Sequence, residues 1–255
     1  MKPGLYIVGT PIGNLDDTTA RALETLRNVD FILAEDTRHT RILLDRFSIK
    51  TYLISCHRFS ECSRIPMVLD KIRAGQAAGL VTNAGMPGIA DPGARIVRAC
   101  RQGGIYLTVI PGPSSVTAAV ALSGFGGRGF VCEGFLPRKK GARRRRLAEL
   151  KSMSLPIVIL ESPYRCLQFL EEVNDIFLDR EIFMGRELTK LNEECLWGTA
   201  AEIRGRFSGK PGGAPARAVR GELTFVIASA SKKEIRDNTA EPDENEPPAM
   251  GSDSG

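Results

Sequence analysis

Short apolar runs alternate with amphipathic stretches of helical spacing through the first half of the chain. The runs Leu5–Val8, Phe31–Ala34 and Tyr106–Ile110 predict strands, because each is rich in aliphatic, β-branched and aromatic residues. Ile65–Arg73 predicts a helix, because its apolar residues recur every three or four positions. Strands and helices that alternate at this spacing indicate a mostly parallel sheet covered by helices.

Four glycines interrupt this pattern at Gly124–Gly129, and the alternation then resumes. The predicted strands of this second unit are Phe130–Phe135, Ile157–Leu160, Glu181–Gly185 and Leu223–Ala228. We therefore expect an N-terminal α/β domain over residues 1–123 and a C-terminal α/β domain over residues 128–231. Residues 232–255 are polar and acidic and contain three prolines, which predicts a disordered tail.

The composition is that of a globular protein with a basic body. Hydrophobic residues make up 42% of the 255 residues and charged residues 25%, which excludes a wholly disordered chain and a collagen-like fibre. The net charge of +5 hides an asymmetry, because residues 232–255 hold 7 acidic and 3 basic side chains. The body therefore has 32 basic and 23 acidic residues, which favours a polyanionic partner such as RNA or phosphate.

Cysteine usage and hydropathy point to a reduced compartment. The six cysteines are scattered without a CxxC pair, and the chain has only two histidines, so a zinc site is not expected. Cys100 and Cys132 stand among apolar residues, which predicts reduced thiols in the core. No signal peptide precedes the first strand, and the apolar runs are too short to span a bilayer. We therefore expect a cytoplasmic protein.

Three loops rich in glycine and proline follow predicted strands. They are Gly9–Leu15, Thr82–Gly93 and Pro111–Ser115. Ligands of open α/β sheets bind at the carboxyl ends of strands, so these loops could form a backbone wall for adenine, ribose and an amino-acid carboxylate. The first loop is neither the dinucleotide fingerprint nor a P-loop, and a plain strand-to-helix turn remains the alternative. Ser114 and Ser115 are also candidate helix caps.

Charged residues follow three other predicted strands. Glu35 and Asp36 place two carboxylates beside Arg38. They could act as a general base or orient a hydroxyl group. The alternative is that they are acids favoured at a helix N-terminus. Glu161–Arg165 and Arg186–Lys190 form either a second charged wall facing the first half or surface ion-pair clusters.

Residues 138–146 contain seven cations in nine positions. Such runs are often only solvated, but a cluster of this density after a strand favours contact with a phosphate backbone. Because successive residues of a helix point in different directions, we expect two or three of Arg143–Arg146 to contact RNA.

The order of these motifs resembles that of one enzyme family. Across residues 5–228 it runs GTPIGNL, AEDTRHT, NAGMPGIADPG, PGPSS, EGFLPRKKGARRRRL, ESPYR, RELTKLNEE and RGELTFV. It is similar to the ribose methyltransferases of small-subunit ribosomal RNA, within the tetrapyrrole-methylase-like superfamily. The resemblance implies a two-domain α/β fold of the class III methyltransferases, with a mostly parallel sheet in the first domain and a mixed sheet in the second. It also implies a homodimer that binds S-adenosylmethionine between its domains and methylates the 2′-OH of a decoding-centre cytidine in 16S rRNA.

Carried over residue by residue, the resemblance and the motifs assign three groups of residues. The candidates for catalysis are Glu35, Asp36 and Lys190. The cofactor-binding candidates are Gly9, Thr10, Pro11, Asn83, Ala84, Gly85, Pro111, Ser114 and Ser115 in the first half, with Phe135, Leu136, Pro137, Ser162 and Glu187 in the second. The RNA-binding candidates are Arg38, Arg138, Lys139, Lys140, Arg143, Arg144, Arg145 and Arg146.

The chain departs from the family pattern at residues 82–87, where Thr-Asn-Ala-Gly-Met-Pro replaces the usual Ser-Asp-Ala-Gly-Thr-Pro. A carboxylate is thus replaced by Asn83 and a hydroxyl by Met86. Two alternatives stay open. One is a tetrapyrrole C-methyltransferase, which would need no polybasic run, and the other is a non-catalytic RNA-binding or assembly factor of the same fold.

Overall fold

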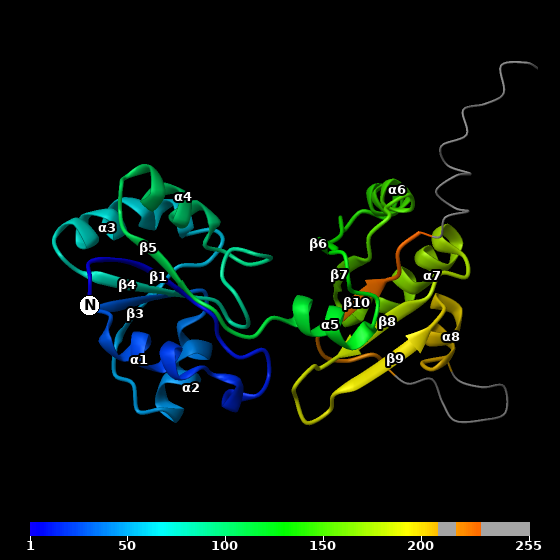
Figure 1. Ribbon diagram of the computed structural model, residues 1–255, viewed down its shortest axis with the longest axis horizontal. Helices are drawn as coiled ribbons and strands as arrows, with labels where there is room; N and C mark the ends of the chain where they lie inside the picture. The colour runs from blue at the N-terminus through cyan, green and yellow to red at the C-terminus, as the bar shows by residue number, and fades with distance from the viewer. Residues whose placement is uncertain (209–217, 231–255) are drawn as a thin grey trace, which may run out of the picture.

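The computed structural model describes residues 1–208 and 218–230, which form two lobes (Figure 1). The first lobe is built on a parallel five-stranded sheet of order β3-β2-β4-β1-β5. Its strands are β1 (Gly4–Val8), β2 (Phe31–Ala34), β3 (Tyr52–Ser55), β4 (Ala77–Val81) and β5 (Leu107–Ile110). The central strands β2 and β4 are buried at every position, as expected for a sheet covered on both faces.

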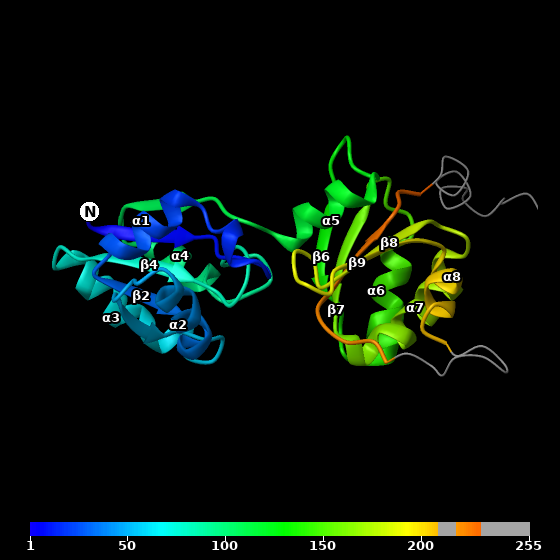
Figure 2. The same cartoon turned by 90° about the horizontal axis from the view of Figure 1, so that it is seen from below.

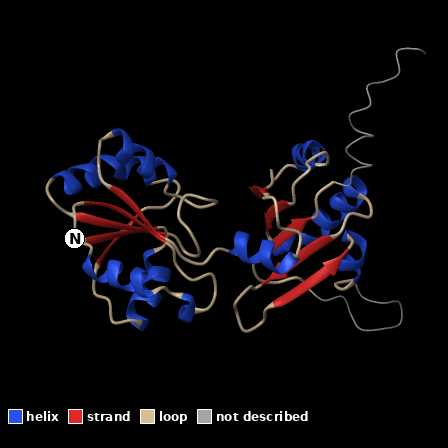
Figure 3. Cartoon of the chain, in the orientation of Figure 1, coloured by secondary structure: helices blue, strands red, loops and turns tan. Residues whose placement is uncertain are grey.

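Two pairs of helices cover the two faces of this sheet (Figure 3). On one face lie α1 (Ala20–Asn28) and α2 (Thr37–Arg46), and on the other lie α3 (Glu61–Arg73) and α4 (Ala94–Gln102). A short 3-10 turn, η1 (Leu15–Asp17), precedes α1. Because strand side chains alternate, Ile32 contributes to the core beneath the first pair of helices and Leu33 to the core beneath the second. Because all neighbouring strands are parallel, their carboxyl ends lie at the same edge of the sheet.

The second lobe is built on a mixed five-stranded sheet of order β6-β7-β10-β8-β9. Its strands are β6 (Val131–Phe135), β7 (Ile157–Glu161), β8 (Ile182–Arg186), β9 (Glu194–Gly198) and β10 (Leu223–Ile227). Only β6 and β7 are parallel, and the other neighbours are antiparallel. The parallel sheet of the first lobe and the mixed sheet of the second agree with the expected fold class.

One face of the second sheet is covered by α6 (Lys140–Leu150), α7 (Cys166–Phe177) and α8 (Ala200–Gly205), with the 3-10 turn η2 (Pro163–Arg165) before α7. The other face is covered by α5 (Ser115–Ser123), which packs against β8 and β10. The alternation of strands and helices predicts α5 in the first domain, but the chain crosses to the second lobe before this helix (Figure 2). Because α5 is apolar on several sides, its pattern does not indicate which sheet it covers.

Three further sequence expectations bear on the fold. Cys100 is buried as expected, but the prediction for Cys132 is wrong, because this side chain is exposed on the edge strand β6. In the described parts of the chain, no helix is long and apolar enough to cross a membrane. The predicted acidic tail lies outside the described residues.

Candidate functional site

A cavity of about 410 Å³ lies between the two lobes. Its first-lobe lining comes from the loops after β1, β2 and β4, and its second-lobe lining from the ends of β6, β7 and β8 and from the residues at the start of β10. A smaller cavity of about 180 Å³ adjoins it and shares Ile12, Asn83, Ala84 and Glu222. The larger volume falls within the roughly 300–1,000 Å³ common for small-molecule sites.

The glycine- and proline-rich loops of the first lobe lock together to form one wall. Thr10 and Gly85 exchange two backbone hydrogen bonds of 3.0 Å, and the Thr10 hydroxyl donates to the Thr82 carbonyl at 3.2 Å. Gly85 has φ +76°, a conformation that favours glycine. A Cβ atom at Gly112 would lie 2.9 Å from the backbone of Gly9, so the loops after β1 and β5 can approach this closely only as glycines.

The structure brings together part of the predicted cofactor wall. Asn83, Ala84, Ser115, Phe135 and Ser162 line the larger cavity. The smaller cavity is lined by Thr10, Pro11, Asn83 and Ala84.

The remaining predicted cofactor residues lie elsewhere in the described chain. Gly9 packs against Gly112, and Gly85 pairs with Thr10, but neither glycine lines either cavity. The other predicted positions outside both linings are Pro111, Ser114, Pro137 and Glu187. Leu136 requires a correction, because its side chain is 2% exposed and belongs to the core beneath α6, α7 and α8. Phe135 and Leu136 are neighbours, so the two side chains point in different directions and only the first reaches the cavity.

The two adjacent carboxylates after β2 have different roles. Glu35 lines the larger cavity, and its Oε2 accepts a hydrogen bond from the Asn83 N–H at 3.4 Å. Asp36 is the N-cap of α2 and accepts from the Arg38 N–H at 2.9 Å. Hydrogen bonds from the side chain and backbone of Arg38 lower the pKa of Asp36 to about 2. These contacts correct the expectation for Asp36, which caps the helix while Glu35 faces the cavity.

Asp91 is a cavity residue that is not among the predicted site residues. It lines the larger cavity from the end of the loop between β4 and α4. Burial raises the pKa of its carboxyl to about 6, and repulsion from Glu35 and Glu222 adds to this effect. The available signal was the Asp-Pro-Gly sequence that closes the second glycine-rich loop.

Lys190 lies in an ion-pair cluster rather than free in the cavity. Its Nζ is 2.9 Å from Glu187 Oε1 and 3.0 Å from Glu222 Oε2, and its side chain lines the smaller cavity. Burial alone would lower the pKa of Lys190, but the hydrogen bonds to both carboxylates outweigh it and raise the pKa. Next to this cluster, the Asn14 N–H donates to the Thr189 hydroxyl at 3.1 Å and links the lobes. The lysine therefore joins Glu187, directly after β8, to Glu222, directly before β10.

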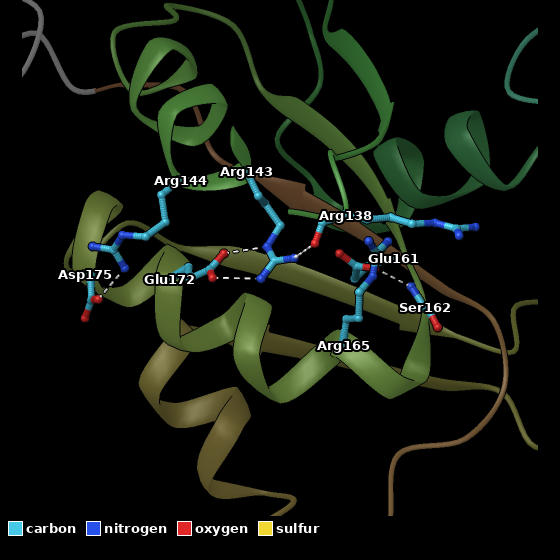
Figure 4. A network of polar contacts seen from close by, with 8 residues as sticks. All are labelled: Arg138, Arg143, Arg144, Glu161, Ser162, Arg165, Glu172 and Asp175. Carbon is cyan, nitrogen blue, oxygen red and sulfur yellow. Dashed lines mark hydrogen bonds and ion pairs between the residues drawn. The ribbon is translucent and has the colours of Figure 1, made fainter. Parts of the chain in front are cut away.

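Three of the seven cations in the polybasic run are engaged in ion pairs with neighbouring acids, and Figure 4 shows the pairs of Arg143 and Arg144. Arg143 is 1% exposed, and its Nε and Nη2 donate to Glu172 at 2.6 and 2.8 Å. This corrects the prediction that Arg143 binds RNA, because its guanidinium is buried between α6 and α7. Arg144 pairs with Asp175 at 2.8 Å, and Arg146 pairs with Glu133 and Glu149. The exposed cations of the run are Arg138, Lys139, Lys140 and Arg145.

Comparisons with known proteins agree with this architecture. Residues 4–204 match the tetrapyrrole (corrin/porphyrin) methylase family. The chain is 46% identical over 224 residues to ribosomal RNA small subunit methyltransferase I of Thermotoga maritima, covering 88% of this chain and 97% of that protein. It is 38% identical over 231 residues to the Bacillus subtilis protein of the same name, covering 91% of this chain and 77% of that one.

Solved structures share the fold at low sequence identity. A uroporphyrin-III C-methyltransferase from Thermus thermophilus, solved with S-adenosylhomocysteine, has a TM-score of 0.59 at 17% identity and covers 88% of this chain and 96% of its own. A conserved hypothetical protein from Aeropyrum pernix has a TM-score of 0.67 at 16% identity, with 92% and 87% covered. With the two-lobed fold and the cavity between the lobes, these similarities show that the chain belongs to the tetrapyrrole methylase family, among the ribosomal RNA small subunit methyltransferase I proteins.

Proposed function

We propose that this protein transfers a methyl group from S-adenosylmethionine to the 2′-OH of a cytidine in the decoding centre of 16S rRNA. The observation that carries the proposal is the interlobe cavity, formed in a chain that is 46% identical to a ribosomal RNA small subunit methyltransferase over nearly its whole length. We further propose that it acts in the cytoplasm as a homodimer.

The residues of the cavity fit the cofactor. The Asn83 Oδ1 atom is buried and has no hydrogen-bond partner among the described residues, so it is available to an N–H or O–H group of a ligand. Ala84 and Ser115 beside it, with Phe135 and Ser162 from the second lobe, would hold the ligand between polar and apolar surfaces. S-adenosylmethionine supplies a methyl group on a positively charged sulfur, and Glu35, Asp91 and Glu222 give this cavity a negative lining.

The chain itself must bind, align and deprotonate the RNA hydroxyl. A methyl group on sulfonium transfers readily once the attacking oxygen is in line, so alignment by the two lobes is a large part of catalysis. A ribose hydroxyl becomes a good nucleophile only as its proton leaves, so a carboxylate of the cavity must accept that proton. Outside the cavity, the exposed side chains of Arg138, Lys139, Lys140 and Arg145 would contact phosphates of the RNA.

A methyl-transfer assay with purified small ribosomal subunits tests this proposal. We expect a radioactive methyl group in 16S rRNA that maps to one ribose 2′-oxygen of a decoding-centre cytidine. Transfer to a tetrapyrrole and not to RNA would favour the C-methyltransferase alternative. Failure to bind S-adenosylmethionine in a calorimetric titration, with RNA binding intact, would favour the non-catalytic factor.

A further inference from the structure

Four carboxylates line the larger cavity, and in the described chain three of them are engaged by protein groups. Glu35 accepts from the Asn83 N–H. Glu161 Oε1 pairs with Arg165 at 2.6 Å and accepts from the Ser162 N–H, while its buried Oε2 has no hydrogen-bond partner among the described residues. Glu222 pairs with Lys190. Asp91, the fourth, has no side-chain hydrogen bond or ion pair within residues 1–208 and 218–230, so its carboxylate faces the cavity unengaged.

The loop that carries Asp91 is held firmly in place. The Gly88 N–H donates to the Pro92 carbonyl at 3.2 Å and closes the turn around Asp91. Beyond it, Glu61 on α3 is 4% exposed, and its Oε1 accepts from the backbone N–H groups of Gly93, Arg95 and Ile96 at 3.1, 2.8 and 3.2 Å.

Glu61 therefore caps α4 from a neighbouring helix, where the N-cap residue Gly93 has no side chain to do so. This contact holds the backbone at Gly93, two residues after Asp91, in place.

The charges around Asp91 make it a stronger base than an ordinary aspartate. Burial, followed by repulsion from Glu35 and Glu222, raises the pKa of Asp91 to about 6. Lys190 on the loop after β8 and Arg95 on α4 are engaged elsewhere. Lys190 is held by two glutamates, and the Arg95 guanidinium lies 2.8 Å from the Cys62 sulfur. At neutral pH the carboxylate is therefore mostly ionised and still close to its pKa, as an efficient general base requires.

Building on the methyl-transfer function proposed above, we propose that Asp91 is the group that accepts the proton of the attacking ribose hydroxyl. The proton passes from the 2′-oxygen to a carboxylate oxygen of Asp91. The electron pair released on the 2′-oxygen forms the new bond to the methyl carbon, and the pair of the breaking carbon–sulfur bond stays on sulfur. The products are the methylated ribose, a neutral thioether and a protonated Asp91, which returns its proton to water.

The test compares wild type with Asp91→Asn, Asp91→Glu and the control Asp70→Asn, which changes an exposed aspartate on α3 whose partner Arg73 is 3.9 Å away. For each protein, kcat and KM for small ribosomal subunits are measured from pH 5.5 to 8.5 at saturating S-adenosylmethionine. Two readouts do not depend on activity. One is the Kd for S-adenosylhomocysteine by calorimetry, and the other is a titration of carbon-13-labelled aspartate carboxyls by NMR.

We expect Asp91→Asn to lower kcat by about 100-fold or more, the usual contribution of a general base, and Asp91→Glu to recover part of the rate. The KM of Asp91→Asn for small ribosomal subunits and its Kd for S-adenosylhomocysteine should stay within about threefold of the wild-type values, because only a transition-state interaction is lost. The wild-type kcat should fall below pH 6, and one aspartate carboxyl titrating near that pH should vanish from the Asp91→Asn spectrum. Asp70→Asn should match wild type in every measurement.

Several results would overturn the assignment. If the wild type methylates RNA and the kcat of Asp91→Asn is within about threefold of the wild-type kcat, another group takes the proton. A Kd that weakens in parallel with kcat would make Asp91 a cofactor ligand instead. The absence of an aspartate titrating above about pH 5 would remove the electrostatic basis. If the wild type binds S-adenosylhomocysteine but methylates no RNA, the proposed function itself fails, and the proton transfer with it.

Discussion

The buried ion pair between Arg143 and Glu172 allows a quantitative test of whether Arg143 stabilises the fold rather than binding RNA. Both side chains are 1% exposed, and two hydrogen bonds of 2.6 and 2.8 Å join them, with a third from Arg143 Nη1 to the Arg138 carbonyl at 3.3 Å. Replacing Arg143 by Ala leaves the Glu172 carboxylate buried and unpaired, which typically costs about 3–5 kcal/mol. For a chain of this length, that corresponds to a decrease in Tm of roughly 6–20 °C.

Arg144→Ala is the matched control, because it removes the next arginine of the same helix. Its pair with Asp175 is 39% and 47% exposed, so the loss should be at most about 1 kcal/mol. Both variants are compared by thermal and urea unfolding, followed through circular dichroism. Equal stability losses in the two variants, or a loss below about 1 kcal/mol for Arg143→Ala, would refute this assignment. Replacing both Arg143 and Glu172 by apolar residues should recover much of the stability, because no buried charge is then left unpaired.

Three other predictions concern RNA, the cofactor and pH. Changing Lys139 and Lys140 to Gln should weaken binding to the small ribosomal subunit and reduce the slope of log K against log salt by about 0.7–0.9 per lost phosphate contact. Filter binding measures this slope, and an unchanged slope would place the RNA elsewhere. Gly112→Val should abolish S-adenosylmethionine binding in a calorimetric titration, because the new side chain displaces Gly9, and undiminished affinity would contradict this. The raised pKa of Asp91 means that its ionised form destabilises the folded state progressively from about pH 4 to pH 6 and fully above it. Asp91→Asn should therefore be more stable than wild type at pH 8, and because solvent screens this partly exposed group, the gain should be well under about 3 kcal/mol. The gain should vanish below pH 4 in urea unfolding, and equal gains at both pH values would count against this reasoning.

The part of the cavity that is lined by glycine-rich loops was predictable from the sequence, because these loops have a local sequence pattern. The glycines after β1, β4 and β5 indicate where the backbone approaches a ligand, because glycine tolerates such close contacts and positive φ angles best. Asn83, Ala84 and Ser115 follow from these signals, and all three line the cavity. The role of Asp91 does not follow from them, because its raised pKa depends on burial and on Glu35 and Glu222, which the fold brings to it from other parts of the chain.

The sequence by itself determined the elements and their order. Phe31–Ala34 is a strand with the predicted bounds, and Ile65–Arg73 forms the larger part of α3, because the spacing of apolar residues is a local property. The tertiary structure alone decided how the charges are used. Glu172 lies 29 residues beyond Arg143, and only the packing of α6 against α7 buries that arginine and removes it from the surface. Likewise, α5 belongs to the second sheet because its partners β8 and β10 come later in the chain, where no local pattern can indicate them.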